Sequence, residues 1–181
     1  TDVSNYGSIS AKSGSAALVS GSNAKLSIST DGKIVVKISE SDLANLIQNG
    51  GTINSDNGQV LIKSSAAQSL VKATIKGPSG KRKLISDNGV LKLVSNNGTI
   101  KGKSVKIDAG KNGLVDNSGT INVSSSTGKA GSVEVTGKEI SINSGSKILA
   151  KGKNGGGDVL IGGDWKGSGD LLQATFTTVE K

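Results

Sequence analysis

The sequence predicts an all-β protein, a right-handed parallel β-helix with about 22 residues per coil. Three observations lead to this prediction: a recurring phrase that ends in isoleucine, short strands of alternating aliphatic residues, and a near absence of aromatic residues. Aromatics make up 2% of the 181 residues, and 27 residues are glycine. Globular cores normally bury large rings. These numbers therefore indicate a thin core of small β-branched side chains.

The recurring phrase reads NYGSI, NGGTI, NNGTI and NSGTI in its four copies. The copies begin at Asn5, Asn49, Asn96 and Asn117, and are separated by 44, 47 and 21 residues. These gaps correspond to about two, two and one units of roughly 22 residues. A meander of hairpins does not predict such a spacing, whereas stacked coils of three strands and three turns do. The Asn-Gly pairs favour turns with a left-handed backbone.

Alternating aliphatic residues follow the phrase and indicate strands with one buried face. Lys106 stands between two aliphatic residues, and so does Glu134. Period-2 alternation places one side chain in the core and the next in solvent. We expect the same for Ile34, Val36 and Ile38. The side chains expected to point inward are those of Ile53, Val60, Val105, Ile107, Val133 and Val135.

Two segments interrupt the strand pattern and predict one or two short helical insertions. Residues 39–42 form a capping box, followed by Leu43, Leu46 and Ile47 at helical spacing. Residues 65–71 form the second helix-friendly run. Pro78 marks a loop over residues 77–83, because proline cannot donate to a strand ladder. No linker divides the chain, so residues 1–181 are expected to form a single section of a larger repeat-built protein.

Two longer runs resemble filamentous-haemagglutinin-type exoproteins, the high-molecular-weight adhesins of two-partner secretion. One run, within residues 34–70, reads VKISESDLANLIQNGGTINSDNGQVLIKSSAAQSL and is similar to the region downstream of their secretion domain. The other, GGDVLIGGDWKGSG at residues 156–169, resembles their glycine-rich phrase. Together with the NNGTI and NSGTI phrases, the resemblance covers most of the chain.

The resemblance implies a structural and adhesive β-helical fibre on the outer surface of a Gram-negative bacterium. Its implied partners are host cell-surface glycans or extracellular matrix. Export would use an outer-membrane transporter partner. The family's Asn-Pro-Asn-Gly phrase is missing, so this segment is not expected to contact that transporter.

The composition excludes several classes of chemistry. Histidine and cysteine are absent, which excludes Ser-His-Asp and Cys-His catalysis and His/Cys metal sites. We therefore expect no enzyme, no catalytic residues, no metal and no cofactor. The alternative is a polysaccharide-processing β-helix, for which Asp158 and Asp164 are the nearest approach to a carboxylate pair. Residues 155–164 do not match the calcium-binding nonapeptide Gly-Gly-x-Gly-x-Asp, because here each aspartate directly follows a pair of glycines.

The charge pattern gives one candidate binding site. Lys81, Arg82 and Lys83 are adjacent in a chain of net charge +8, and could bind an anionic glycan or form a solvated loop. Nucleic acid is not expected, because arginine forks and stacking aromatics are missing. Membrane insertion is not expected either, because no apolar run reaches the roughly 18 residues needed.

Two further motifs concern modification and turns. Asn97 and Asn122 begin glycosylation triplets, which also arise by chance in chains rich in Asn, Ser and Thr. A glycine-rich run is expected to be a structural turn motif. Its members are Gly162, Gly163, Asp164, Gly167 and Gly169.

Overall fold

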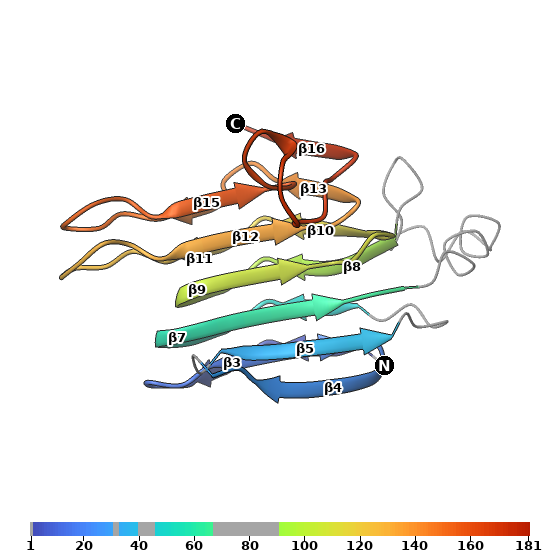
Figure 1. Ribbon diagram of the computed structural model, residues 1–181, viewed down its shortest axis with the longest axis horizontal. Helices are drawn as coiled ribbons and strands as arrows, with labels where there is room; N and C mark the ends of the chain where they lie inside the picture. Colours follow the sequence, from blue (N-terminus) through green and yellow to red (C-terminus); the bar gives the residue numbers. More distant parts are fainter. Residues whose placement is uncertain (1, 31–32, 40–45, 67–90) are drawn as a thin grey trace.

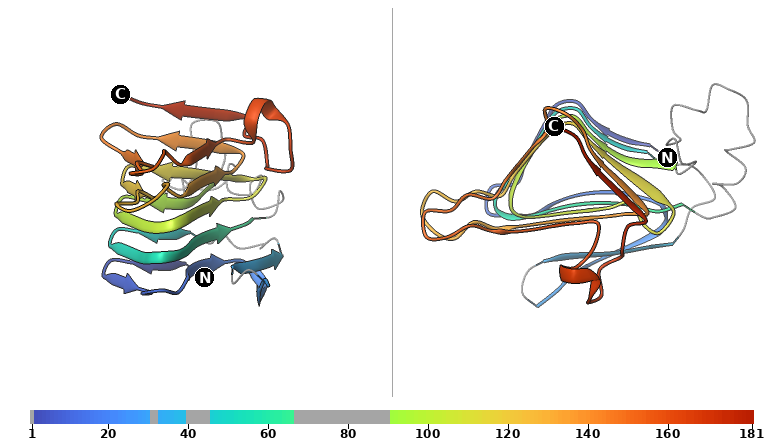
Figure 2. Two further views of the ribbon diagram at one scale, coloured as in Figure 1. Left: turned by 60° about the vertical axis from the view of Figure 1, so that its left-hand side comes forward. Right: turned by 90° about the horizontal axis from the view of Figure 1, so that it is seen from above.

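The computed structural model describes residues 2–30, 33–39, 46–66 and 91–181. In these residues the chain is all-β apart from one short 3-10 helix. Its strands stack as parallel rungs (Figure 1), and the rungs follow a roughly triangular outline when viewed along the stack (Figure 2). The prediction of an all-β fold with parallel strands is confirmed.

One face of the stack is a six-stranded sheet in which every pair is parallel. We call it sheet A. Its strands, in spatial order, are β1 (Val3–Asn5), β6 (Ile47–Asn49), β8 (Leu91–Asn96), β10 (Gly113–Asn117), β13 (Glu139–Ile142) and β16 (Phe176–Val179).

The second sheet, sheet B, is also parallel and has eight strands. Two of them are long and each pairs with several shorter strands, so sheet B continues around a corner of the triangle (Figure 2). Its strands are β2 (Ser8–Ser10), β3 (Ala16–Ser20), β7 (Thr52–Ser64), β9 (Thr99–Asp108), β11 (Thr120–Asn122), β12 (Ser132–Thr136), β14 (Lys147–Leu149) and β15 (Asp158–Ile161).

An antiparallel hairpin is the exception to parallel pairing. It consists of β4 (Ser22–Ile28) and β5 (Ile34–Ser39). The alternation expected in this region is correct, since Val36 is buried and Val35 is exposed. The assignment of Ile34, Val36 and Ile38 to a parallel coil is wrong, because β5 pairs antiparallel with β4. Alternation decides which side chains are buried, but it does not decide which strand supplies the backbone partner.

The rung spacing along the sequence corrects the prediction of a uniform coil of about 22 residues. The Asn5 rung pairs directly with the Asn49 rung, 44 residues later, and Asn49 pairs with Asn96 after 47. Asn96 then pairs with Asn117 after only 21 residues. Each gap is therefore one step of the stack. The β4–β5 hairpin lies inside the first gap, and backbone pairing does not restrict the length of chain between paired strands.

The predicted helical insertions are partly corrected. Ile47, which was placed at helical spacing, begins strand β6. Residues 40–45 and 67–71 lie outside the described residues. The helix found in the described part of the chain is the 3-10 helix η2 (Trp165–Gly167), which was not predicted.

The inward-facing aliphatic residues form ladders between the sheets. The six side chains expected to point inward are each exposed by no more than 1%, so this prediction is confirmed. Ile53 pairs in register with Ile100, and Ile100 with Ile121. Burying a side chain of this size contributes about 1.5–3 kcal/mol. The core is therefore a set of stacked columns rather than a cluster of large rings.

A column of buried asparagines runs up one corner. Asn5 Nδ2 donates to Asn49 Oδ1 at 2.8 Å, Asn49 to Asn96 at 2.8 Å, and Asn96 to Asn117 at 2.7 Å. Asn117 closes the column by donating to the Gly119 carbonyl at 3.4 Å. Asn49 and Asn96 thus each accept from one amide and donate to the next, while the oxygen of Asn5 accepts from the Gly7 N–H. These bonds remove most of the cost of burying the amides.

The glycine of the repeated phrase is needed for close stacking, and the left-handed backbone suggested by the sequence is not the reason. None of Gly51, Gly98 and Gly119 has a positive φ. A Cβ on Gly98 would collide with the Gly51 carbonyl oxygen, and one on Gly119 with the Gly98 oxygen. The rungs approach each other too closely at this corner for a side chain.

Replacing Val133 by Asp should destabilise the fold by several kcal/mol, because an unpaired carboxylate would be buried in the core. Glu134→Gln is the matched control on the adjacent outward position. It should cost no more than about 1 kcal/mol, the value of an exposed ion pair. Urea denaturation measures both. Equal losses in the two variants would show that the faces are assigned incorrectly.

Gly98→Ala should cost about 1–3 kcal/mol, because its Cβ forces two rungs apart. The control is Gly7→Ala in the same column, since a Cβ on Gly7 meets nothing within 4 Å. Thermal melts of the two variants compare them directly. A Gly7 variant that melts as early as the Gly98 variant would contradict the stacking explanation.

Candidate functional site

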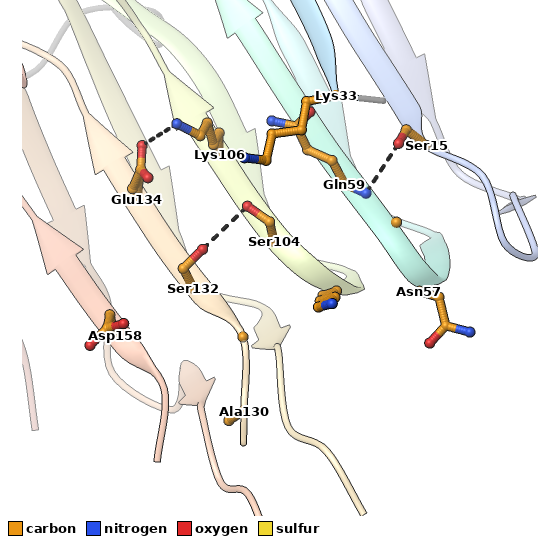
Figure 3. Close-up of a pocket in the computed structure, with 13 residues that line it drawn as sticks. Ser15, Lys33, Asn57, Gln59, Ser104, Lys106, Ala130, Ser132, Glu134 and Asp158 are labelled. Atoms are coloured by element: carbon orange, nitrogen blue, oxygen red, sulfur yellow. Dashed lines mark hydrogen bonds and ion pairs between the residues drawn. The ribbon is translucent and has the colours of Figure 1, made fainter. Parts of the chain in front are cut away.

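The predicted cationic loop of Lys81, Arg82 and Lys83 lies outside the described residues. Within the described part of the chain, the candidate site is a polar groove of about 480 Å³ on the outer face of sheet B. We call it the outer groove. Its lining includes Ser15, Gln59, Ser104, Ser132 and Asp158 (Figure 3).

The strand register assembles this groove. Gln59, Ser104, Ser132 and Asp158 are direct partners on successive strands β7, β9, β12 and β15. Each precedes a valine, buried at Val60, Val105 and Val133 and 40% exposed at Val159 on the terminal strand β15. Alternation therefore directs the four polar side chains to the outer face, where Gln59 is nevertheless buried. The result is a column of short polar groups that crosses the strands and follows the stacking direction (Figure 3).

Hydrogen bonds hold this column in place. Ser132 Oγ donates to Ser104 Oγ at 3.3 Å, and the Gln59 backbone N–H donates to Ser15 Oγ at 3.2 Å. The Gln59 side-chain oxygen accepts from the Ile34 N–H at 3.2 Å. The β4–β5 hairpin is thereby fixed beside the groove, over the outer face of sheet B.

An ion pair lies beside this column, at the next outward-facing positions of β9 and β12. Lys106 Nζ lies 2.7 Å from Glu134 Oε2, and both residues line the groove. Asp158 lies 3.7 Å from Lys129, where both side chains are well exposed. The two carboxylates of the groove therefore each face an ammonium group.

Two loops beside the groove carry a cluster of lysines. The loops follow β11 and β14 and project together from the stack (Figure 1). A parallel bridge joins Ser125 to Gly152, and the Asn154 N–H donates to the Gly128 carbonyl at 3.2 Å. Neither loop contains an acidic residue. Lys103, which lies within β9 directly before Ser104, lines the groove next to these loops. We call this lysine and the lysines on the two loops the basic rim: Lys103, Lys129, Lys151 and Lys153.

A further ion pair lies at the Asn57 end of the groove. Lys101 Nζ approaches Asp56 Oδ1 to 3.2 Å. The hydrogen bond from Lys101, together with one from Asn54, holds the pKa of Asp56 below its usual value. Asp56 therefore ionises more readily than an aspartate without these partners.

The structure separates the two aspartates considered for catalysis. Asp158 lines the outer groove, whereas Asp164 caps η2 and accepts from the Trp165 N–H at 2.9 Å. The carboxylate nearest to Asp158 in the strand register is instead that of Glu134 on β12. The sequence suggested Asp164 as the partner carboxylate of Asp158 because the two are only six residues apart. The pairing of β12 with β15, which brings Glu134 near Asp158, is not evident from the sequence alone.

The glycine-rich motif forms the turn around η2. Its four glycines have positive φ, from 68° to 143°, which other residues rarely adopt. Asp164 lies among them as the helix cap. These glycines are Gly162, Gly163, Gly167 and Gly169.

The two glycosylation triplets lie in different surroundings. Asn97 is exposed in the turn before β9. Asn122 is half-buried at the end of β11, and its side-chain oxygen accepts from the Ser124 N–H at 2.9 Å. Asn97 is thus the more accessible of the two acceptors.

The outer groove was missed from the sequence, although a signal was present. In four copies of the strand phrase, one polar residue precedes the first valine: Gln59, Ser104, Ser132 and Asp158. These residues differ in type, so they do not form a motif by themselves. Their common position becomes visible only once the register is known.

Within the described residues, no group of three His, Cys, Asp or Glu side chains could hold a metal ion. No helix in the same part of the chain is long and apolar enough to cross a membrane. Hydroxyl, amide and ammonium groups supply the chemistry of the groove together with two carboxylates, each of which faces a lysine. The hydroxyl and amide groups suit a ligand rich in hydroxyls, and the remaining ammonium groups suit negative charge. A scan of family models and a search of curated proteins gave no match to this chain.

Proposed function

We propose that this chain is a non-catalytic section of a right-handed β-solenoid, part of a large secreted adhesin that attaches bacteria to host surfaces. The observation that carries the proposal is the set of continuous side-chain columns that run from rung to rung. Such a stack is rigid along its axis, because each rung is bonded to the next. A rigid rod is what a surface fibre needs in order to hold a binding face away from the cell.

The edges of the stack support a place in a longer solenoid. β1 and β16 are the terminal strands of sheet A. Outward backbone groups on a terminal strand favour pairing with a further strand. We propose that additional rungs of a larger exoprotein cover these edges.

The resemblance of residues 34–70 and 156–169 to filamentous-haemagglutinin-type exoproteins supports secretion and surface display. The proposed route is export through an outer-membrane transporter of a Gram-negative bacterium. The proposed partners are host glycans or extracellular matrix. Lys81, Arg82 and Lys83 remain a proposed contact for anionic glycans, alongside the outer groove.

The groove is proposed to bind without cleaving. Glycoside hydrolysis commonly needs one carboxylic acid to protonate the leaving oxygen and a second carboxylate across the sugar. Here Glu134 and Asp158 each face a lysine ammonium. Release of reducing ends from an acidic polysaccharide, lost in Asp158→Asn or Glu134→Gln, would contradict this part of the proposal.

Beads coated with the chain should attach to cultured epithelial cells more than uncoated beads do, because many copies convert weak contacts into avidity. Enzymatic removal of acidic glycans from the cells should reduce this attachment. Beads coated with Val133→Asp, which disrupts the core, serve as the control for the folded state. Attachment no greater than that of uncoated beads would refute the adhesive function.

A further inference from the structure

We propose that the outer groove and the basic rim bind one linear anionic polysaccharide, rich in uronate or sulfate, that lies along the stacking direction. This inference rests on the proposed adhesive function and names its ligand class and its site. It places the ligand on described strands and loops, away from Lys81, Arg82 and Lys83.

The orientation follows from the strand register. The polar column of the groove has one residue per rung, from Ser15 through Gln59, Ser104 and Ser132 to Asp158 (Figure 3). Gln59 is only 5% exposed and its side-chain oxygen is bonded to the β4–β5 hairpin, so Ser104, Ser132 and Asp158 form the continuous accessible part of the column. Successive rungs are about 4.8 Å apart, which is comparable to the length of one sugar ring. A linear polysaccharide along the column would therefore place one ring over each rung.

The polar groups suit sugar hydroxyls. Ser104 and Ser132 keep lone pairs available beyond their mutual bond at 3.3 Å. Glycines flank the column at Gly58 and Gly131, where a Cβ would collide with the carbonyl oxygens of Gly14 and Lys103 respectively. The close stacking that requires these glycines also leaves the groove hollow beside the column.

The charges select an anionic ligand. Within the groove, Lys106 is balanced by Glu134, and Lys129 lies near Asp158. In the described part of the chain, no ion pair joins Lys103, Lys151 or Lys153 to an acid. Lys103 lines the groove, and Lys151 and Lys153 add a concentration of positive charge on the loop after β14, which projects beside it. Such a concentration attracts carboxylate or sulfate groups, and a neutral polysaccharide gains nothing from it.

The absence of rings in the groove disfavours nucleic acid. Single-stranded nucleic acids bind chiefly through stacking on aromatic side chains together with a basic track. No residue that lines the groove is aromatic. The site therefore offers hydrogen bonds and charge but no stacking platform.

Titration calorimetry with heparin and oligogalacturonate fragments of defined length tests the proposal on the full chain. Affinity should rise with length up to about three rings, one for each accessible rung of the column, and then level off. It should fall steeply between low and physiological salt. Neutral dextran fragments and single-stranded DNA of equal charge serve as comparison ligands. The sulfated and uronate fragments show which anionic group is preferred.

Two variants remove the proposed contacts. Lys103→Gln, Lys151→Gln and Lys153→Gln together neutralise the rim and should weaken binding by about tenfold or more. Ser104→Asp places an anion in the groove and should have a similar effect. The fold already accommodates a carboxylate in this column at Asp158. The matched control is the triple change Lys138→Gln, Lys166→Gln and Lys181→Gln, which removes the same net charge elsewhere.

Equal loss in the rim and control variants would overturn the proposal, since attraction would then depend on net charge alone. Equal affinity for dextran or for single-stranded DNA would overturn it as well. Loss of binding on replacing Lys81, Arg82 and Lys83 by Ser, with the groove variants unaffected, would move the ligand to that loop. In that case bead attachment to cells would persist in the groove variants, so the adhesive function would stand while this inference fails.

Discussion

Parallel backbone hydrogen bonding between rungs is the constraint on which the rest of this structure depends. It fixes successive rungs about 4.8 Å apart, so every position along the strand meets its equivalent above and below. Aliphatic residues then stack into columns, as Ile53, Ile100 and Ile121 do. Buried amides must bond along the same direction, which the asparagine column achieves. Where the turn brings two backbones closest, as at Gly98, only hydrogen fits in place of a side chain.

The core and the candidate site are two faces of the same strands. Alternation along β12 buries Val133 and turns Ser132 and Glu134 outward. The register that stacks the buried valines therefore also aligns the polar groups of the outer groove. A change in register would destroy both at once, because side-chain direction reverses with each residue. Stability and binding geometry are coupled through the backbone in this fold.

The segments between paired strands are free to vary, since stacking does not restrict their length. The β4–β5 hairpin occupies one such interval and covers part of the outer face of sheet B. The two loops that carry Lys129, Lys151 and Lys153 occupy others, and they project together because one stacks on the other. Recognition groups commonly lie on loops that a rigid scaffold positions. Here the scaffold also supplies part of the recognition surface.

The sequence by itself determined the all-β class, the parallel stacking of the Asn-Gly phrases and the inward face of strands β5, β7, β9 and β12, because these depend on local alternation and on repetition. It did not determine how many residues lie between rungs, and it assigned Ile34 to Ile38 the wrong pairing partner. The sequence also did not show that the side chains of Asn49 and Asn96 are buried, because an asparagine next to a glycine is equally typical of an exposed turn. Only the tertiary structure decided these points. Hydrogen bonds between residues 21 to 47 positions apart fix the register, and the register alone brings Gln59, Ser104, Ser132 and Asp158 into one column.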